Sequence, residues 1–540
     1  MLKALQNKPI IPLTIIVVLM LAFSIDCVPV SIMEARNFIT AREMLTDGNW
    51  LLTTMNGEAR YEKPPLPTWM TAIFGWIFGL KSLLALRFPA IIFIAVIGIF
   101  IYLLSKKILE DKAHSFTNAL IGITSFYVIG ITLEAPWDIF THGYMLIAIY
   151  HLFQLFQKQH QFAKHSILAG IFMGCSILCK GPISIYALLL PFVLAYGFTF
   201  RYKQFKPKLI PVLFCIILAL IIGGWWYVYV RMSDPLTFEA IATRETNNWH
   251  SYNTKPFYYY WSFFTQSGIW TIPAFISLIY PYLKSKVSNL KVYQFSLLWT
   301  IFAVILLSLI PEKKSRYLMP VLIPLAINIG FYVNYLIRCF KIMKDKREKI
   351  PVYFNFGLIA LIAILFPVAL YFFVGEKLMG RWVFFTITTI ITVSIGILIL
   401  INLKKKNIQK VFMLTVAFFV AIFIFALPLL KPVIGTSNNP ITNLEYKNLK
   451  IYGLNSISPE MIWQYGDKIP PLKSEDGSLN LPSEEKFGIL SLNMSTKDFK
   501  LLQAKYEIQK VNTFDLNTVS PRSKRYNDRL VNEFYILTRL

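Results

Sequence analysis

The sequence has few charged residues for its length. Only 15% of its 540 residues are charged, whereas 56% are hydrophobic and the mean hydropathy is +0.54. Soluble domains carry roughly 25% charged residues, so the water-soluble classes are excluded. The composition is typical of a polytopic α-helical membrane protein.

Cysteine is also scarce. The five cysteines are scattered and lie in or at the ends of apolar segments: Cys27, Cys175, Cys179, Cys215 and Cys339. A disulfide framework or a thiolate metal site needs several cysteines at characteristic spacings, so both are excluded. Cys175 and Cys179 are four residues apart on one expected helix, and packing in the core explains them better.

Common nucleotide-binding and hydrolase signatures are missing. The chain has no Walker A or Rossmann fingerprint, no Gly-x-Ser-x-Gly and no His-Glu-x-x-His sequence. Nucleotide-driven transport therefore has no support. Internal repeats and low-complexity tracts are absent as well.

Long apolar runs dominate the chain instead. Runs long enough to cross a bilayer lie near 10–30, 86–104, 116–134, 138–156, 166–180, 182–200, 209–232, 257–283, 292–310, 317–337, 353–374, 382–402 and 411–430. The shorter run 66–80 is expected to dip into the outer leaflet without crossing, because only then do all the basic loops share one side. The pattern predicts about thirteen transmembrane helices, with the N-terminus in the cytoplasm and the C-terminus outside.

The loops assigned to the cytoplasm share an excess of lysine and arginine. They contain Lys3, Lys8, Lys106, Lys107, Lys112, Lys158, Lys164, Arg201, Lys203, Lys206, Lys208, Lys284, Lys286, Lys291, the cluster 338–349, Lys404, Lys405, Lys406 and Lys410. The net charge of +25 follows this one-sided distribution. We therefore interpret it as a topology signal and expect no nucleic-acid partner.

The composition changes near Thr436. We expect a transmembrane domain over 1–435, whose first outer loop is 31–69, and a small soluble α/β domain over 436–540. The tail has strand-like runs at 450–454, 487–492, 506–516 and 533–538, and helical patterns near 459–465 and 496–504.

The first outer loop, 31–69, is the leading candidate for a functional site. Its start, from Met33 to Leu45, has helical spacing and ends at Asp47-Gly48. Glu34 follows Ser31 by three residues, which is the spacing of a capping box. A carboxylate at this place could equally act as a general base, so both interpretations stay open.

Several cations lie on the outer side against the usual insertion bias. They are Lys63, Lys180 and the cluster Lys313, Lys314 and Arg316. Pro64-Pro65 stiffens the backbone beside Lys63. Cations that topology misplaces need an anionic partner, and a phosphate is the leading hypothesis. The alternative is that their head groups merely extend to the lipid surface.

Ionisable residues also occur at the ends of the expected spans. Asp138 lies at an outer helix end, and His142 shares its face one turn further along. An ionisable residue on a membrane span is a candidate functional residue, although a carboxylate also suits a first helical turn. Lys180-Gly181-Pro182 marks a tight outer corner that serves as a turn or a ligand contact. Glu62 and His250 could form part of a divalent metal site, although two ligands are weak evidence and no cofactor is required.

Taken together, these motifs resemble the GT-C membrane glycosyltransferases. The similarity is greatest to bacterial relatives of protein O-mannosyltransferases, including the aminoarabinose transferase that modifies lipid A. The matching pieces span roughly residues 10–330. They are Glu34-Ala35-Arg36, Ala41-Arg42-Glu43-Met44, Asn56-Gly57, Glu62-Lys63-Pro64-Pro65-Leu66, Arg87-Phe88-Pro89, Asp138, Lys180-Gly181-Pro182, Pro256-Phe257-Tyr258-Tyr259 and Ser315-Arg316-Tyr317-Leu318-Met319-Pro320.

The resemblance implies transfer of a sugar from a polyprenyl-phosphate donor to lipid A, another envelope lipid or a protein at the periplasmic face of a bacterial inner membrane. Glu34 or Asp138 is then expected to be the catalytic carboxylate. Lys63, Arg316 and Lys313 are expected to bind the donor phosphate. Further substrate-binding residues are expected at Arg36, Glu62, Lys180, His142 and Tyr317.

One departure bears on the catalytic carboxylate. The family usually has an Asp-Glu pair in this loop, and the chain has Met33-Glu34 instead. A secondary transporter or lipid flippase is the rival hypothesis, because it also places charges in a membrane cavity. Such proteins usually have paired halves with broken helices at the midplane. No such symmetry is visible in the sequence, and the ionisable residues gather at one face.

Overall fold

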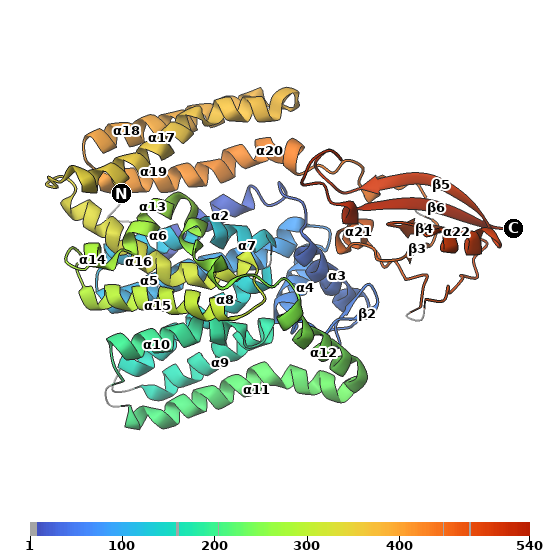
Figure 1. The fold of residues 1–540 in the computed structure, drawn as a ribbon, viewed down its shortest axis with the longest axis horizontal. Coiled ribbons are helices and arrows are strands. Elements are labelled where there is room, and N and C mark those ends of the chain that lie inside the picture. Colours follow the sequence, from blue (N-terminus) through green and yellow to red (C-terminus); the bar gives the residue numbers. More distant parts are fainter. Residues whose placement is uncertain (1–7, 135, 158–160, 203–204, 447, 475–476) are drawn as a thin grey trace.

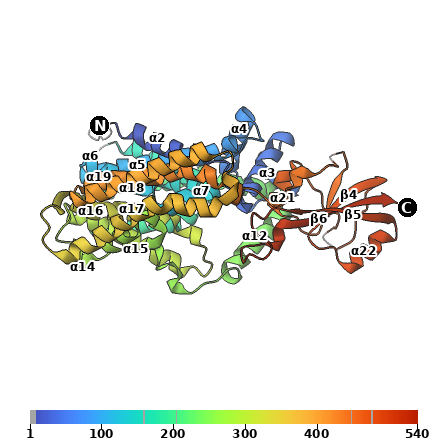
Figure 2. The ribbon, with the colours of Figure 1, turned by 90° about the horizontal axis from the view of Figure 1, so that it is seen from above.

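The computed structural model describes residues 8–134, 136–157, 161–202, 205–446, 448–474 and 477–540. Three of the basic-loop residues, Lys3, Lys158 and Lys203, lie outside these ranges. Two parts follow one another along the chain. A bundle of roughly parallel and antiparallel helices is followed by a small sheet domain at one end (Figures 1 and 2). We call this end of the bundle the domain-side end.

The bundle consists mainly of long apolar helices. They are α2 (Ile10–Ala22), α5 (Leu83–Leu109), α6 (Lys112–Ile123), α7 (Phe126–Glu134), α8 (Pro136–Gln157), α9 (Phe162–Lys180), α10 (Leu190–Thr199), α11 (Leu209–Ser233), α15 (Leu290–Leu309), α16 (Met319–Cys339), α17 (Lys346–Val374), α18 (Trp382–Lys404), α19 (Ile408–Ala421) and α20 (Leu427–Ile434). Buried leucine, isoleucine and phenylalanine side chains join most of them in one hydrophobic core. The expected polytopic helical fold is confirmed.

Within the described residues, nine helices are long and apolar enough to cross a membrane, or ten if α6 and α7 form one bent span. Three shorter apolar helices lie at Ile10–Ala22, Leu66–Phe78 and Ile185–Thr199. The second of these, α4 (Leu66–Phe78), has 13 residues and is about 20 Å long, too short to cross a bilayer upright. The count of thirteen spans stays a prediction.

Two apolar runs do not form the single helices that periodicity suggests. The run 116–134 is divided into α6 and α7, which meet at an angle of 51°. The run 257–283 is divided into η3 (Phe257–Tyr260), η4 (Phe263–Trp270), α13 (Thr271–Ser277) and α14 (Tyr280–Leu283). Gly268, inside η4, has a φ of 65°, which breaks the helical path. Hydropathy reports burial in lipid, so it does not detect such breaks.

The C-terminal part contains a four-stranded mixed sheet in the order β3-β4-β6-β5. The strands are β3 (Ile451–Leu454), β4 (Lys486–Ser491), β5 (Tyr506–Asp515) and β6 (Val531–Arg539), and the helices are α21 (Pro459–Tyr465) and α22 (Thr496–Gln503). β3 and β4 are parallel, whereas β6 is antiparallel to both β4 and β5. Alternating apolar residues in short runs are typical of such strands, and these elements match the expected ones closely.

The first loop connects the bundle and the sheet domain. It contains α3 (Ile32–Thr46), the short hairpin β1 (Thr54–Met55) and β2 (Glu58–Ala59), and then α4. α3 lies between the bundle and the sheet domain in both views, with α21 beside it (Figures 1 and 2). Because α3 is covered on several sides, almost all of its middle residues are buried although the helix is only weakly amphipathic. This packing fixes the loop that carries the candidate site.

Candidate active site

Glu34 lies at the start of α3 and is fully paired. Its carboxylate accepts bonds from Arg87 Nε at 2.8 Å and Arg87 Nη2 at 2.9 Å, and both side chains are 1% exposed. The Ser31 amide donates to Glu34 Oε2 at 3.0 Å, and the Ser31 hydroxyl accepts from the Glu34 amide at 3.3 Å. The expected capping box is therefore present. Burial raises the pKa of the Glu34 carboxyl, and the Arg87 guanidinium offsets only part of this rise.

Arg87 is the partner that sequence reasoning missed. It lies in the second turn of the long helix α5, and it also donates to the carbonyl oxygens of Val28 at 3.1 Å and Pro29 at 3.4 Å. A guanidinium that holds a carboxylate and several carbonyls ties together the segments on which it acts. The Arg87-Phe88-Pro89 motif indicated its importance, but no pattern in the sequence named Glu34 as its partner.

Asp138 and Lys180 form a second buried ion pair, from the start of α8 and the end of α9. Asp138 is 1% exposed, and the Lys180 side chain is 8% exposed. Gly181, with a φ of 70°, turns the chain directly after Lys180. Asp138 Oδ2 has no hydrogen-bond partner among the described residues, and neither has His142 Nδ1 one turn further along α8. The structure thus brings Asp138, His142 and Lys180 together.

Arg316 and Tyr317 approach this pair from the turn before α16. The Lys180 ammonium lies 5.2 Å from the centroid of the Tyr317 ring, and the Arg316 guanidinium carbon lies 5.9 Å from the same ring. Arg316 is close enough to interact electrostatically with both Asp138 and Lys180. The Tyr317 hydroxyl donates to Glu312 at 3.2 Å, whereas the buried Arg316 Nε has no partner within the described chain.

The first loop adds a third cation, Lys63, which interacts electrostatically with Lys180. Three consecutive residues of this loop are paired with α12 (Pro235–Ser251) or with Asp234 before it. The Tyr61 hydroxyl donates to Asp234 at 3.1 Å, Glu62 bonds Arg244 at 2.6 Å, and the Lys63 ammonium lies 3.5 Å from Glu245. Burial raises the pKa of Tyr61 to about 12.

Arg60 is a further residue that sequence reasoning missed. Its Nη1 donates to the Arg36 carbonyl at 2.9 Å and to Thr40 at 2.8 Å, and its guanidinium lies 5.1 Å from the centroid of the Trp137 ring. Burial lowers the pKa of Arg60 to about 10, so it remains charged at neutral pH. Trp137 precedes Asp138, so Arg60 connects the first loop with the Asp138 pair.

Two expected site residues do not join this cluster. Lys313 is 2% exposed, and its ammonium donates to the carbonyl oxygens of Lys255 at 3.1 Å and Ile310 at 2.5 Å. These bonds explain a buried lysine without any ligand, so its expected role as a phosphate ligand loses its support. The side chain of His250 lies outside the described residues.

The described side chains do not favour a divalent metal at Glu62. No group of three or more metal-ligating side chains occurs in the described part of the chain. Glu62, the other expected ligand, already bonds the cationic Arg244. A guanidinium on the carboxylate opposes a metal cation at the same place.

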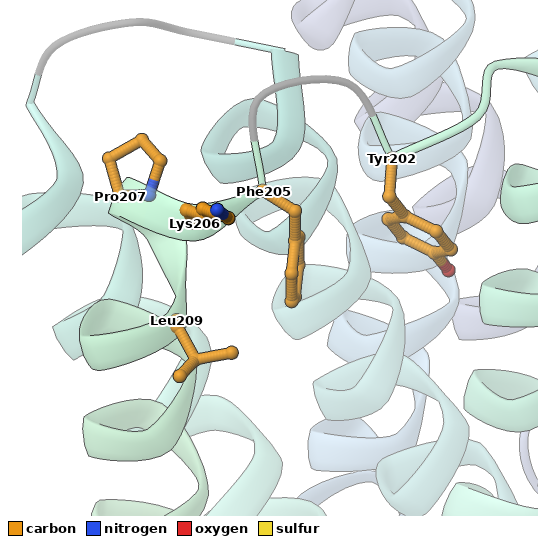
Figure 3. Close-up of a pocket in the computed structure, with 5 residues that line it drawn as sticks. All are labelled: Tyr202, Phe205, Lys206, Pro207 and Leu209. Carbon is orange, nitrogen blue, oxygen red and sulfur yellow. The ribbon is translucent and has the colours of Figure 1, made fainter.

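A surface hollow of about 720 Å³ lies elsewhere, near the start of α11. Tyr202, Phe205, Lys206, Pro207 and Leu209 line it (Figure 3). It is remote from Asp138, because α11 runs from this hollow to Asp234 beside Tyr61 at the domain-side end. Among the described residues, its lining contains no carboxylate and one cation, Lys206, so we do not take it as the candidate site.

The candidate site is defined by buried polar atoms that have no partner. Buried polar side-chain atoms normally make hydrogen bonds, so unsatisfied ones mark places where a ligand or water belongs. Within the described residues, six such atoms gather around the Asp138–Lys180 pair or along the Arg60 connection to it. They are Arg36 Nε, Glu62 Oε2, Trp137 Nε1, Asp138 Oδ2, His142 Nδ1 and Arg316 Nε.

The fold and the site define a class of membrane protein. The structure superposes on that of ArnT from Cupriavidus metallidurans bound to undecaprenyl phosphate, with a TM-score of 0.67, 14% sequence identity, and coverage of 98% of this chain and 97% of ArnT. The chain therefore has the GT-C fold that its motifs indicate. A model of the family "Dolichyl-phosphate-mannose-protein mannosyltransferase" also matches residues 62–226, the segment that contains Lys63, Asp138 and Lys180.

Sequence relatives agree with this class. The chain is 25% identical over 353 residues to "Undecaprenyl phosphate-alpha-4-amino-4-deoxy-L-arabinose arabinosyl transferase 2" of Proteus mirabilis, covering 62% of this chain and 60% of that protein. It is 24% identical over 401 residues to the corresponding transferase of Shewanella sediminis, covering 70% and 68%. An uncharacterised Aquifex aeolicus protein is 26% identical over 300 residues, covering 55% and 58%. The chain is thus related to the aminoarabinose transferases, and it aligns with about three fifths of the length of the first of these relatives.

Proposed function

We propose that this protein transfers a sugar from a polyprenyl-phosphate donor to an acceptor at the outer face of a bacterial inner membrane. One observation carries the proposal. A buried carboxylate with an unpaired oxygen, Asp138, lies beside cations from separate segments at one end of a membrane bundle. The name of the Proteus mirabilis relative, an undecaprenyl-phosphate-linked sugar transferase, supports this class of donor.

The chemistry divides between the carboxylate and the cations. The acceptor oxygen attacks the anomeric carbon, and Asp138 Oδ2 accepts its proton. The bond between the anomeric carbon and the phosphate oxygen breaks, and the polyprenyl phosphate leaves with the bonding electrons. Lys63 and Arg316 stabilise the charge on this leaving group. Lys180 holds Asp138 in its ionised form and fixes its orientation.

Other side chains are assigned to substrate binding. His142 and Tyr317 lie beside the Asp138–Lys180 pair, and Arg36 lies beside Arg60; these polar groups are available for the hydroxyls of a sugar. Glu62 belongs to the first loop, and Arg244 holds its carboxylate. Glu34 has no free oxygen, so we assign it to holding the first loop instead of to the reaction.

The orientation in the membrane is part of the proposal. The basic loops favour a cytoplasmic N-terminus, and with this orientation the site and residues 436–540 face the periplasm. The first described residues and the sheet domain lie at opposite ends of the bundle, which supports opposite sides for the two termini (Figures 1 and 2). A reporter fused after Leu540 should be active in the periplasm. Activity only in the cytoplasm would reverse the orientation.

The acceptor is lipid A, another envelope lipid or a protein. Mass spectrometry of lipid A and of envelope glycans, with and without the gene, would identify the product. The expected result is a mass difference of one sugar residue in one of these fractions. Unchanged masses in all of them, with a substrate instead accumulating on one side of the membrane, would favour the rival transporter. That rival lacks structural support, because the candidate site is at one end of the bundle and not at its middle.

A further inference from the structure

The Asn56-Gly57 turn connects the first loop to the sheet domain. It closes the hairpin β1–β2 with φ values of 59° at Asn56 and 83° at Gly57, the left-handed conformation that two-residue hairpins prefer. The Asn56 side chain points away from the hairpin. Its Nδ2 donates to the Ile469 carbonyl at 2.7 Å, and the Ile469 amide donates to Asn56 Oδ1 at 2.7 Å. The carboxamide therefore pairs with the backbone of Ile469 as a neighbouring strand would.

Glu43 of α3 also holds the hairpin in place. Glu43 is 0% exposed, and its carboxylate accepts bonds from the Asn56 amide at 2.6 Å, the Gly57 amide at 3.2 Å and the Thr54 hydroxyl at 2.6 Å. A carboxylate that accepts three bonds at a turn defines the direction in which the turn projects. Glu43 thus presents the Asn56 side chain to the sheet domain.

Three contacts along α3 and at its C-terminal end reinforce this attachment. The rings of Phe38 and Trp463 are 5.2 Å apart, and Ile39 joins a buried cluster with residues of the sheet domain, among them Met461. Asp47 pairs with Lys468, the residue before Ile469, at 2.7 Å. The sheet domain is therefore held by one continuous surface of α3 and its hairpin.

The other end of the hairpin leads directly to the candidate site. The Arg60 amide donates to the Thr53 carbonyl at 2.8 Å, and the Thr53 hydroxyl donates to the Arg60 carbonyl at 2.6 Å. The next three residues are Tyr61, Glu62 and Lys63. A short bonded path thus connects the sheet domain with the lysine that is proposed to bind the donor phosphate.

We propose that the sheet domain positions the donor-binding loop, and that Asn56 is the positioning residue through which it does so. This inference rests on the proposed function for its link to the donor, whereas its mechanical part stands on the contacts alone. Holding Lys63 in place before the donor arrives lowers the entropic cost of binding. Loosening the hairpin should therefore weaken donor binding more than the chemical step.

Asn56→Gly is the appropriate variant, because glycine accepts the positive φ without strain and removes only the side chain. Asn455→Gly is the matched control. Asn455 also has a positive φ, of 68°, and donates one side-chain bond, to the Asn493 carbonyl at 2.8 Å, within the sheet domain. The full-length protein in lipid nanodiscs would be measured in two ways. These are hydrogen exchange over 53–63 and binding of undecaprenyl phosphate.

Asn56→Gly should speed exchange over 53–63 by about tenfold and weaken undecaprenyl phosphate binding by a similar factor, because two hydrogen bonds are lost. The turnover at saturating donor should change little, and Asn455→Gly should match the wild type. Unchanged exchange in Asn56→Gly would overturn the positioning role. Faster exchange with unchanged binding would overturn the link to the donor site. If the wild type binds no undecaprenyl phosphate, the proposed function fails, and the exchange measurement still decides the mechanical part.

Discussion

Two buried ion pairs near the domain-side end of the bundle differ in how completely they are bonded. In the Glu34–Arg87 pair, both carboxylate oxygens accept guanidinium bonds, and the Ser31 amide adds another. In the Asp138–Lys180 pair, one carboxylate oxygen has no partner among the described residues. Both carboxylates are 1% exposed, so burial alone does not separate them.

This difference indicates which of the two candidate carboxylates has a structural role and which has a catalytic one. A general base needs a free lone pair and access to the proton that it removes. Both oxygens of Glu34 already accept hydrogen bonds that hold α3 to α5, so neither oxygen is free for the acceptor proton. Asp138 has a free oxygen and pairs with Lys180, and Arg316 and Lys63 both interact electrostatically with Lys180. The neighbouring Met33 has no group that accepts a proton.

The largest expected effect comes from Asp138. Asp138→Asn should lower turnover by about 10²–10⁴-fold, because the amide cannot accept the proton. Lys180 also loses its counter-charge, so some stability is lost and turnover must be expressed per folded molecule. Steady-state kinetics with purified protein would measure the change. Turnover within about twofold of the wild type would remove Asp138 from the chemical step.

Glu34 should affect stability instead. Glu34→Gln leaves Arg87 as an uncompensated buried charge, which costs on the order of 3–5 kcal/mol. Thermal unfolding in detergent would detect this as a clear loss, and the Ser31 cap bond alone cannot compensate. Arg87→Gln should give a similar loss, because it breaks the same pair from the other side. A protein that remains as stable as the wild type in both variants would contradict the structural role.

Arg316→Lys keeps the charge and loses the planar fork that binds two phosphate oxygens at once. We expect a donor half-saturation about tenfold higher, since this geometry contributes roughly 1–2 kcal/mol. Arg338→Lys, near the other end of α16, is the control and should change nothing. An unchanged donor response with weaker acceptor use would assign Arg316 to the acceptor.

Lys63→Ala removes one charge-assisted bond to the donor phosphate, which contributes about 1.5–3 kcal/mol. In the wild type, Glu245 competes with the phosphate for this ammonium, so the net contribution of the bond is reduced. The net effect should thus be smaller than the bond alone suggests. Titration with undecaprenyl phosphate would measure it. Binding equal to that of the wild type would exclude Lys63 from the phosphate site.

The smallest effect is expected for the more exposed ion pair Asp47–Lys468. This pair serves for comparison with the buried pairs Glu34–Arg87 and Asp138–Lys180. The bond from Lys468 lowers the pKa of Asp47, and the same bond raises the pKa of Lys468. The Asp47 contribution is present above its ordinary pKa near 3.8 and is lost as the pH falls through the lowered value. Hydrogen exchange over α3 should therefore rise slightly in acid. The same rise in Asp47→Asn would show that another group is responsible.

Much of the fold follows from the sequence, because hydropathy and alternation report burial directly. The apolar runs locate most of the long helices, and the strand-like runs at 450–454 and 533–538 lie within a residue or two of β3 and β6. Hydropathy did not predict the breaks within the runs 116–134 and 257–283. Their bends come from packing around residues such as Gly268, and packing has no sequence period.

The sequence predicted the candidate site only in part. Misplaced cations and an ionisable residue on a span pointed to Lys63, Lys180, Arg316 and Asp138, and these lie in one region. The Arg87 partner of Glu34 and the Arg60 contact with Trp137 were missed, because each joins distant segments. Lys313 followed the same charge rule as Arg316, yet its ammonium bonds backbone carbonyls. Charge patterns do not distinguish a ligand-binding lysine from one that closes a loop.

The central claim is that Asp138, and not Glu34, takes the acceptor proton during sugar transfer from a polyprenyl phosphate. The most direct measurement is the release of undecaprenyl phosphate from its sugar-linked form by the wild type, Asp138→Asn and Glu34→Gln, at a low temperature where all three remain folded. We expect acceptor-dependent release by the wild type and by Glu34→Gln, and almost none by Asp138→Asn. Release by Asp138→Asn at the wild-type rate, with none by Glu34→Gln, would contradict the account.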